Sequence, residues 1–225
     1  GVGSIDSTGS VNTDVGFSII SWTGTGSNGT VAHGLGVEPE MIIVKGRTYV
    51  ENWPVYLKIL GNTSRLALDI TNGTAGSRIE WNSTTPTSSL ISLGTHNGVN
   101  RNANTYIAYC FASVDGYSKI GSYTGNGSTD GTFVYTGFRP AFVMFKRTNA
   151  TGSWRIMDNK RDTFNVADAR LLADTSGAET TDRDILDMVS NGFKFRRADA
   201  GNNGSGDTYI YMAFAEQPTK YANAR

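Results

Sequence analysis

The sequence predicts an all-β protein built from two tandem, structurally equivalent antiparallel units, each a β-sandwich or jelly-roll-like fold. The main observation is a duplication: Gly-Val-Glu-Pro-Glu-Met-Ile-Ile-Val-Lys at residues 36–45 returns as Gly-Phe-Arg-Pro-Ala-Phe-Val-Met-Phe-Lys at 137–146, and residues 105–112 return at 208–215. The second observation is that short β-branched and aromatic runs are separated by Gly, Asn, Ser and Thr, with almost no helical periodicity. Short strands at turn-bounded intervals are typical of a β-sandwich.

The duplication also divides the chain. Each copy has roughly 100 residues, the size of an independent domain, so we predict one sandwich at residues 16–115 and a second at 116–217. Residues 1–15 are polar and rich in Gly, Ser and Thr, so we interpret them as a linker or arm. Residues 218–225 are interpreted as a polar tail. The first residue is Gly rather than Met, which favours a piece of a longer chain.

In the first copy we expect strands at residues 16–23, 41–44, 53–56, 65–69 and 105–112. The Met-Ile-Ile-Val run at 41–44 is apolar without alternation, so it is predicted to be a central strand covered on both faces. Pro39 stands just before it, where a missing N–H is tolerated. Residues 24–29 match the Gly-x-Gly-x-x-Gly pattern of phosphate loops. No helix follows them, so we predict a hairpin tip instead.

The second copy repeats these elements, with strands expected at residues 142–145, 154–157, 170–174 and 208–215. Trp53 returns as Trp154, and Trp22 returns as Tyr123. These matched aromatic positions are predicted to lie in the core. Residues 184–196 contain an Asn-Gly pair followed by alternating phenylalanines, which favours a hairpin. Polar stretches predicted to be variable surface loops are 46–52, 71–89, 96–104, 148–153, 159–169 and 175–183.

Composition excludes several classes of function. Lys and Arg number 20, as do Asp and Glu, so no net charge favours nucleic acid as a partner. No apolar run is long enough to span a membrane, so membrane insertion is not expected. Cys110 is the only cysteine, which rules out an internal disulfide and a cysteine-based zinc cage. We interpret it as a small buried residue of a strand.

The sequence contains little that could perform catalysis. Its two histidines, His33 and His96, have no counterparts in the other copy, and His33 is expected to make a local backbone hydrogen bond. Asp69 returns as Asp174 at a turn, where Asp is a common structural choice. We therefore predict a non-enzymatic protein without catalytic residues, a metal site or a cofactor. The carboxylates that leave glycan hydrolysis open all lie in the second copy: Asp158, Asp162, Asp168, Asp174, Glu179, Asp182, Asp184 and Asp187.

Two unmatched aromatic residues are the candidates for ligand contact. Tyr49 and Trp81 each lie in a polar stretch and have no aromatic counterpart in the other copy. An exposed aromatic ring can stack on the apolar face of a ligand. Either residue is therefore predicted to contact a ligand if it is exposed.

Several runs resemble one family. They are Gly-Phe-Ser-Ile-Ile-Ser-Trp-Thr-Gly-Thr-Gly at 16–26, His-Gly-Leu-Gly-Val-Glu-Pro-Glu-Met-Ile-Ile-Val-Lys at 33–45, Trp-Asn-Ser-Thr-Thr-Pro-Thr-Ser-Ser at 81–89, Thr-Tyr-Ile-Ala-Tyr-Cys-Phe-Ala at 105–112 and Tyr-Met-Ala-Phe-Ala-Glu at 211–216. Over residues 16–221 the chain resembles the duplicated β-domain near the C-terminal end of tail-fibre and related structural proteins of tailed bacteriophages. The resemblance implies an extracellular protein of the virion surface, usually a homotrimer, that contacts the host and other tail subunits. It transfers no catalytic or binding residue.

The first hypothesis is thus a non-enzymatic tail-fibre domain for receptor binding and host attachment, which recognises a bacterial surface glycan or protein. The alternative is a purely structural virion component, such as a fibre spacer or a capsid decoration. A glycan depolymerase that uses carboxylates of the second copy is a third reading. Exposed Trp81 or Tyr49 beside polar loops would favour the first, and two opposed carboxylates in a cleft would favour the third.

Overall fold

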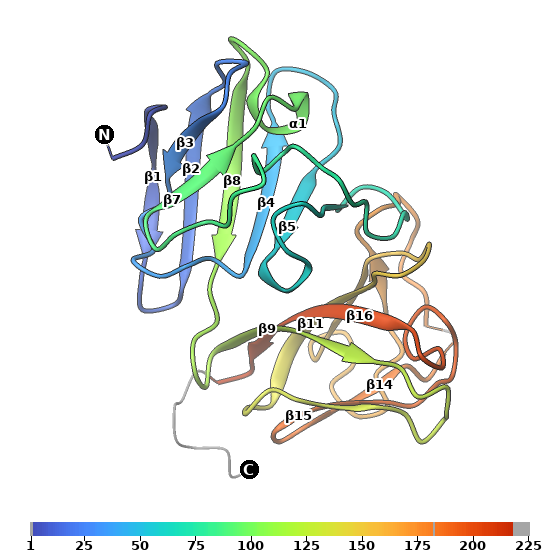
Figure 1. Ribbon diagram of the computed structural model, residues 1–225. Helices are drawn as coiled ribbons and strands as arrows, with labels where there is room; N and C mark the ends of the chain where they lie inside the picture. The colour runs from blue at the N-terminus through green and yellow to red at the C-terminus, as the bar shows by residue number, and fades with distance from the viewer. Residues whose placement is uncertain (1, 182, 218–225) are drawn as a thin grey trace. The chain divides into compact units, whose positions relative to one another are not determined.

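The computed structural model describes residues 2–181 and 183–217 and has an all-β fold of antiparallel sheets (Figure 1). The described residues divide into two compact units. The first comprises residues up to Asp69 together with Thr74–Ala112, and the second comprises Ile70–Gly73 together with the residues from Ser113 onwards. Each unit has a larger and a smaller sheet and its own hydrophobic core, so the predicted all-β sandwich fold is confirmed.

The first unit contains β1 (Ser7–Asn12), β2 (Phe17–Thr23), β3 (Gly29–Ala32), β4 (Met41–Gly46), β5 (Pro54–Leu57), η1 (Lys58–Leu60), β6 (Leu66–Ala67), β7 (Leu90–Leu93), α1 (Asn97–Asn100) and β8 (Thr105–Phe111). The larger sheet has the order β1-β2-β8-β4-β5-β6, and β3 pairs with β7 in the smaller one. β4 lies between β8 and β5, and its residues 41–44 are all buried. The prediction of a central strand there is confirmed.

The second unit contains β9 (Ser118–Thr124), β10 (Phe133–Tyr135), β11 (Pro140–Arg147), β12 (Arg155–Asp158), β13 (Leu171–Leu172), β14 (Leu186–Val189), β15 (Gly192–Phe195) and β16 (Thr208–Ala215). Its larger sheet has the order β13-β12-β11-β16-β9, which repeats the order β6-β5-β4-β8-β2 of the first unit. β10 pairs with β15 as β3 pairs with β7, and β14 is an addition. The two copies therefore share one topology.

β1 corrects the interpretation of residues 1–15 as a linker. It pairs with β2 along its whole length, from Ser7 opposite Trp22 to Asn12 opposite Phe17. Residues 8–12 are exposed on both faces, so this edge strand has no apolar alternation that its sequence could display. Backbone hydrogen bonds hold it in place. The predicted tail at 218–225 lies outside the described residues.

Stacked aromatic pairs mark equivalent positions in the two cores. Trp22 stacks on Tyr106 with ring centroids 5.4 Å apart, and Tyr123 stacks on Tyr209 at 4.7 Å. Such pairs contribute about 0.5–1.5 kcal/mol beyond the area that they bury. The predicted core positions are confirmed for Trp22, Tyr123 and Trp154, which are all buried. Trp53 differs, because it is only half-buried.

Two turn predictions have opposite outcomes. Residues 24–29 connect β2 in the larger sheet to β3 in the smaller one, so the prediction of a hairpin tip is wrong. Sequence alone does not show that consecutive strands belong to different sheets. Residues 184–196 contain the antiparallel β14–β15 hairpin, as predicted.

Candidate functional site

In each unit one asparagine fixes the loop after the strand that carries Trp22 or Tyr123. In the first unit this loop is the one at residues 24–29 that matches the phosphate-loop pattern. Asn100 Oδ1 accepts a hydrogen bond from the Thr25 backbone N–H at 2.9 Å, and its Nδ2 donates to the Ser27 carbonyl at 2.7 Å. Asn203 makes the corresponding two bonds in the second unit, at 3.0 and 2.9 Å. Both asparagines are fully buried. The glycines at 24–29 therefore belong to a turn closed by the protein itself, which satisfies buried polar groups.

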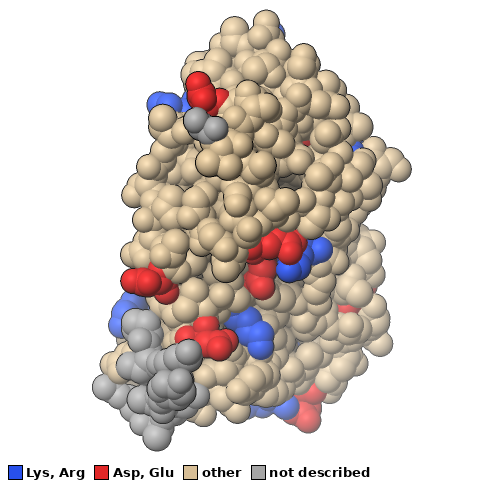
Figure 2. All heavy atoms as spheres, turned by 60° about the vertical axis from the view of Figure 1, so that its left-hand side comes forward, with Lys and Arg blue, Asp and Glu red and all other residues tan. Residues whose placement is uncertain are grey.

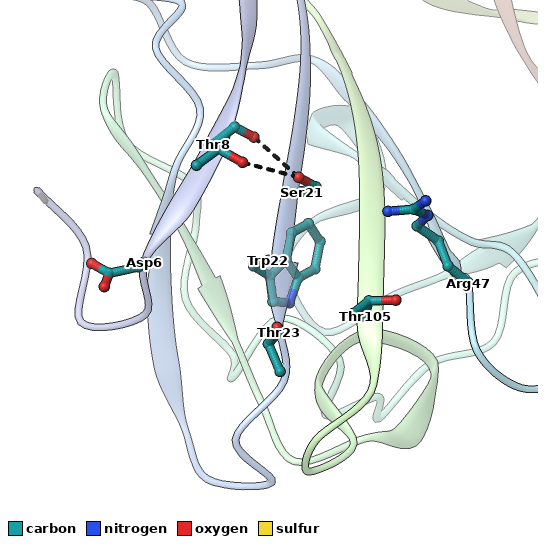
Figure 3. Close-up of a pocket in the computed structure, with 7 residues that line it drawn as sticks. All are labelled: Asp6, Thr8, Ser21, Trp22, Thr23, Arg47 and Thr105. Atoms are coloured by element: carbon teal, nitrogen blue, oxygen red, sulfur yellow. Dashed lines mark hydrogen bonds between the residues drawn. The ribbon is translucent and has the colours of Figure 1, made fainter.

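A shallow polar depression of about 250 Å³ lies on the first unit, over β1, β2 and β8 (Figure 3). Its lining residues are Asp6, Thr8, Ser21, Trp22, Thr23, Arg47 and Thr105. The indole of Trp22 is buried in the core, so Ser21 and Thr23, its neighbours along β2, project from the opposite face of the sheet. The open surface of the depression is thus formed by polar side chains.

Four hydroxyl groups form the middle of this depression. Thr8 and Ser21 are register partners on β1 and β2, and their hydroxyl oxygens are 3.2 Å apart. Thr23 and Thr105 are register partners on β2 and β8. Directly opposed residues of antiparallel strands share a face, with Cβ atoms about 5 Å apart. The sheet therefore holds the four hydroxyls as a row of two cross-strand pairs, which are two residues apart along β2.

Opposite charges stand at the two sides of the row. Asp6 lies on the β1 side and Arg47 on the side beyond β8 (Figure 3). The Arg47 backbone N–H donates to the Thr105 carbonyl at 2.7 Å, which fixes the start of this side chain. Both charged residues are exposed, and within the described part of the chain neither has a salt-bridge partner. Both can therefore hydrogen-bond to a ligand.

Trp81 does not lie on the surface, so its prediction as a ligand contact is wrong. Its side chain is fully buried, packs edge-to-face on Tyr56 at 5.6 Å and donates from Nε1 to the Ser64 carbonyl at 3.2 Å. The polar sequence around it is misleading because one of its polar neighbours, Glu80, is itself fully buried.

Glu80 is the centre of a buried ion cluster. Its Oε1 lies 2.7 Å from Arg78 Nη2, 3.2 Å from Arg65 Nε and 3.6 Å from His96 Nδ1. Burial alone would raise the pKa of Glu80, but Arg78 and Arg65 hold it below its usual value. Together with Trp81, this cluster attaches the long loop at 71–89 to the start of β6.

Tyr49 is half-buried, and parts of its side chain already have protein partners. Its hydroxyl lies 2.9 Å from the Tyr106 hydroxyl, and the Arg101 guanidinium lies 5.1 Å from its ring centroid. Burial, followed by the bond to Tyr106, raises its pKa well above the usual range. Ligand contact by Tyr49 stays a prediction.

The side chains with catalytic potential in the first unit have structural roles. His33 Nε2 lies 3.1 Å from the Thr87 carbonyl and Nδ1 accepts from the Leu35 N–H at 3.3 Å, so the predicted local backbone bond is confirmed. Cys110 is buried in β8, as predicted, and burial raises the pKa of its thiol to about 12.

The stability of the first unit is expected to fall below about pH 6.5. Burial lowers the pKa of His33 and of His96 in the folded state below the ordinary histidine value of about 6.5. Below 6.5 the unfolded chain therefore binds protons that the folded chain does not, and the free energy of unfolding decreases. Both histidines belong to the first unit.

Denaturant titrations between about pH 7.5 and 5.5 check this expectation. The transition of the first unit should move to lower denaturant concentration while that of the second unit moves less. In the double variant His33→Gln and His96→Gln this difference should largely disappear. An unchanged pH dependence in that variant would contradict the assignment to the histidines.

The carboxylates of the second unit are mostly engaged in its loops. Asp162 Oδ2 accepts from the backbone N–H groups of Asp168 and Ala169 at 2.9 and 2.7 Å. Burial and then the neighbouring Asp162 charge raise the pKa of Asp168. Asp182 lies outside the described residues. A groove of about 440 Å³ in this unit is lined by Thr129, Asp168, Thr181, Arg183, Asp184, Arg196 and Arg197.

Asp69 and Asp174 confirm the structural interpretation of the matched aspartates. Asp69 Oδ1 accepts from the Trp53 N–H at 2.9 Å, and Asp174 Oδ1 accepts from the Trp154 N–H at 2.7 Å. Among the residues with described positions, no group of three or more His, Cys, Asp and Glu side chains could hold a metal ion. The same residues include no helix long and apolar enough to cross a membrane.

Comparison with known proteins assigns a family. Residues 1–218 match the model of a family described as a domain of unknown function, DUF7483. The chain belongs to this family. No curated protein and no solved structure matches it.

In this DUF7483 chain, sequence reasoning missed the residues of the polar depression. Asp6 and Thr8 lie in the segment interpreted as a linker. Ser21 and Thr105 lie in strands that were predicted from their apolar residues, so their polar side chains were not considered as a site. The one available signal was the alternation of polar residues with core residues along β2, which places Ser21 and Thr23 on the solvent side.

Proposed function

We propose that this DUF7483 chain is a non-enzymatic adhesion module of a virion surface, a receptor-binding domain of a phage tail fibre that recognises a bacterial surface glycan. The polar depression of the first unit supports the proposal most directly. Hydroxyl, carboxylate and guanidinium groups hydrogen-bond readily to sugar hydroxyls. The four hydroxyl residues lie on paired strands, which hold a site more precisely than loops do, and Asp6 and Arg47 lie directly before β1 and directly after β4.

The distribution of charge is consistent with a glycan as ligand. On the face shown in Figure 2, Lys, Arg, Asp and Glu side chains occur in small groups that contain both signs. A nucleic acid would require a continuous basic surface. Sugar hydroxyls require both donors and acceptors, and the depression supplies them as Arg47 at one side, Asp6 at the other and hydroxyl groups between them.

The place in the virion rests on the resemblance to tail-fibre domains. By this resemblance we also propose a homotrimeric assembly, contacts with other tail subunits and an extracellular location. A purely structural role as a spacer or decoration remains the alternative, and the groove that contains Asp168 and Asp184 is the feature of interest for a depolymerase.

Purified protein should bind host cells and at least one bacterial surface polysaccharide saturably and leave the polysaccharide intact. Shortened polysaccharide chains would overturn the non-enzymatic claim. Absence of binding by a correctly assembled oligomer would favour the structural role. A protein receptor is indicated if cells are bound and none of their polysaccharides is.

The variant Arg47→Thr is expected to weaken this binding about tenfold to a hundredfold, because it removes a charged hydrogen-bond donor. Threonine is the residue that the second unit has at the matched position, Thr148, two residues after the matched lysine. The variant Lys160→Thr removes an exposed cation from a loop of the second unit and serves as the matched control. Equal binding by both variants would place the ligand elsewhere.

A further inference from the structure

β10 of the second unit presents two aromatic rings to solvent. Phe133 is 44% exposed and Tyr135 is 58% exposed, whereas Val134 between them is buried in the core. Residues two apart on a strand share a face, so both rings lie on the outer side of the smaller sheet. Single exposed apolar residues are ordinary, but a pair of large rings side by side on a sheet is not.

The neighbouring strand leaves these rings uncovered. Gly192 of β15 is the register partner of Tyr135. A Cβ atom at Gly192 would lie 2.1 Å from the Val134 carbonyl oxygen and 3.0 Å from Phe133 Cε2. Position 192 thus excludes any side chain, so none projects from β15 beside Tyr135.

The first unit provides an internal comparison. Val31 of β3 is buried as Val134 of β10 is, and the residues that flank it are Thr30 and Ala32. The same topology therefore folds without aromatic side chains at these two positions. Their presence in the second unit is not a requirement of the sandwich.

Two lysines and one aspartate surround the rings. Lys119 Nζ lies 5.1 Å from the Tyr135 ring centroid and donates to the Tyr135 carbonyl at 3.2 Å. Lys194, the register partner of Phe133, pairs with Asp130 at 2.7 Å. A ligand here meets hydrogen-bond donors and acceptors around an apolar centre. Asp130 offsets Lys194, and Lys119 is the further cation at Tyr135, so these groups do not form the cluster of cations that a polyanion requires, and a neutral ligand is the occupant that we assign.

We propose that Phe133 and Tyr135 form a stacking surface for one pyranose ring of a neutral glycan, with Lys119, Lys194 and Asp130 as its hydrogen-bonding partners. A pyranose ring has an apolar C–H face and a rim of hydroxyls, which matches this arrangement. The inference rests on the proposed function as a glycan-binding module, and it adds a second contact in the other unit.

A structural role explains only part of the arrangement. An aromatic ring over a glycine shields the backbone of that strand, and Phe133 does this for Gly192. Tyr135 lies instead near Gly137, where a Cβ atom would be 3.6 Å from the Tyr135 hydroxyl oxygen, so it does not cover Gly192. For this reason the variant Tyr135→Ala is tested beside the double variant Phe133→Thr and Tyr135→Ala, which carries the residues of the first unit.

The test is an NMR titration of the whole chain with methyl β-glucopyranoside, methyl β-galactopyranoside and methyl α-mannopyranoside, up to about 100 mM because single sugars bind weakly. At least one glycoside should saturably shift the ring signals of Phe133 and Tyr135 and the backbone amide signals of Val134 and Lys194, which remain observable in every variant. Tyr135→Ala and the double variant should weaken this binding about tenfold or more. The control variant Phe164→Ala, which removes an 84% exposed ring from a loop of the same unit, should bind like the unchanged protein.

Three results would overturn the inference. They are no shift of either ring by any of the three glycosides, equal saturable shifts of the Val134 and Lys194 amide signals in the double variant, and, in a parallel titration with galacturonate, a response to that anionic sugar alone. Host-cell binding is measured separately. If cells are bound equally well by the double variant and poorly by Arg47→Thr, this inference fails while the proposed function stands. If the unchanged, assembled protein binds no cells, the proposed function itself fails.

Discussion

Replacement of Trp81 by alanine is expected to destabilise the first unit by about 3–5 kcal/mol. The indole fills the core between β5 and the long loop at 71–89, where it contacts Tyr56 and bonds to the Ser64 carbonyl. Alanine would leave a cavity and remove the donor of that carbonyl, and both changes disfavour the folded state. Denaturant unfolding should show the transition of the first unit at a much lower midpoint.

The second unit serves as a reference within the same molecule, because its core is separate. The variant Val50→Ala is a further control, since this side chain is 99% exposed in another loop of the first unit. It should change the free energy of unfolding by less than about 0.5 kcal/mol. If Trp81→Ala unfolded like the unchanged protein and instead lost ligand binding, Trp81 would be a surface contact after all.

The variant Glu80→Gln is expected to destabilise the same unit by about 3–5 kcal/mol. The substitution keeps the shape of the side chain but removes its charge. Arg65, whose side chain is only 12% exposed, would then lack its carboxylate. Midpoints of urea unfolding measure the loss.

A double-mutant cycle isolates the electrostatic contribution. The variant Glu80→Gln with Arg65→Met should recover part of the lost stability, because the uncompensated buried charge is gone. The variant Lys58→Ala breaks the exposed pair with Glu38, which lies in the same unit at 2.8 Å. It should change stability by no more than about 1 kcal/mol. Equal effects of Glu80→Gln and Lys58→Ala would show that the cluster is solvated in solution.

Much of the fold could be predicted because the duplication and the apolar runs are local properties of the chain. The Met-Ile-Ile-Val run predicts a central strand, and β4 is one. Repeated aromatic positions predict core residues, and Trp22 and Tyr123 occupy equivalent stacked pairs. In each case, burial requires an apolar side chain, so the requirement is visible in the sequence.

The errors share a different cause. β1 is an edge strand without a buried face, so backbone pairing alone makes it a strand. Trp81 lies among polar residues, one of which is the buried Glu80. Arg78, two residues before Glu80, is one of its ionic partners, and the other two, Arg65 and His96, come from other segments of the chain. Such partners cannot be identified from a residue's own neighbourhood in the chain.

The all-β class, the duplication, the central strands and most of the core can be read from the chain, because they follow from local propensity and from the burial of apolar side chains. Which polar residues meet depends on the folded arrangement of the strands. It brought Asp6, Arg47 and a row of hydroxyls from three strands to one face, and it left Phe133 and Tyr135 exposed where the first unit has small residues. Sites of this kind depend on strand order and register, which are set by long-range pairing.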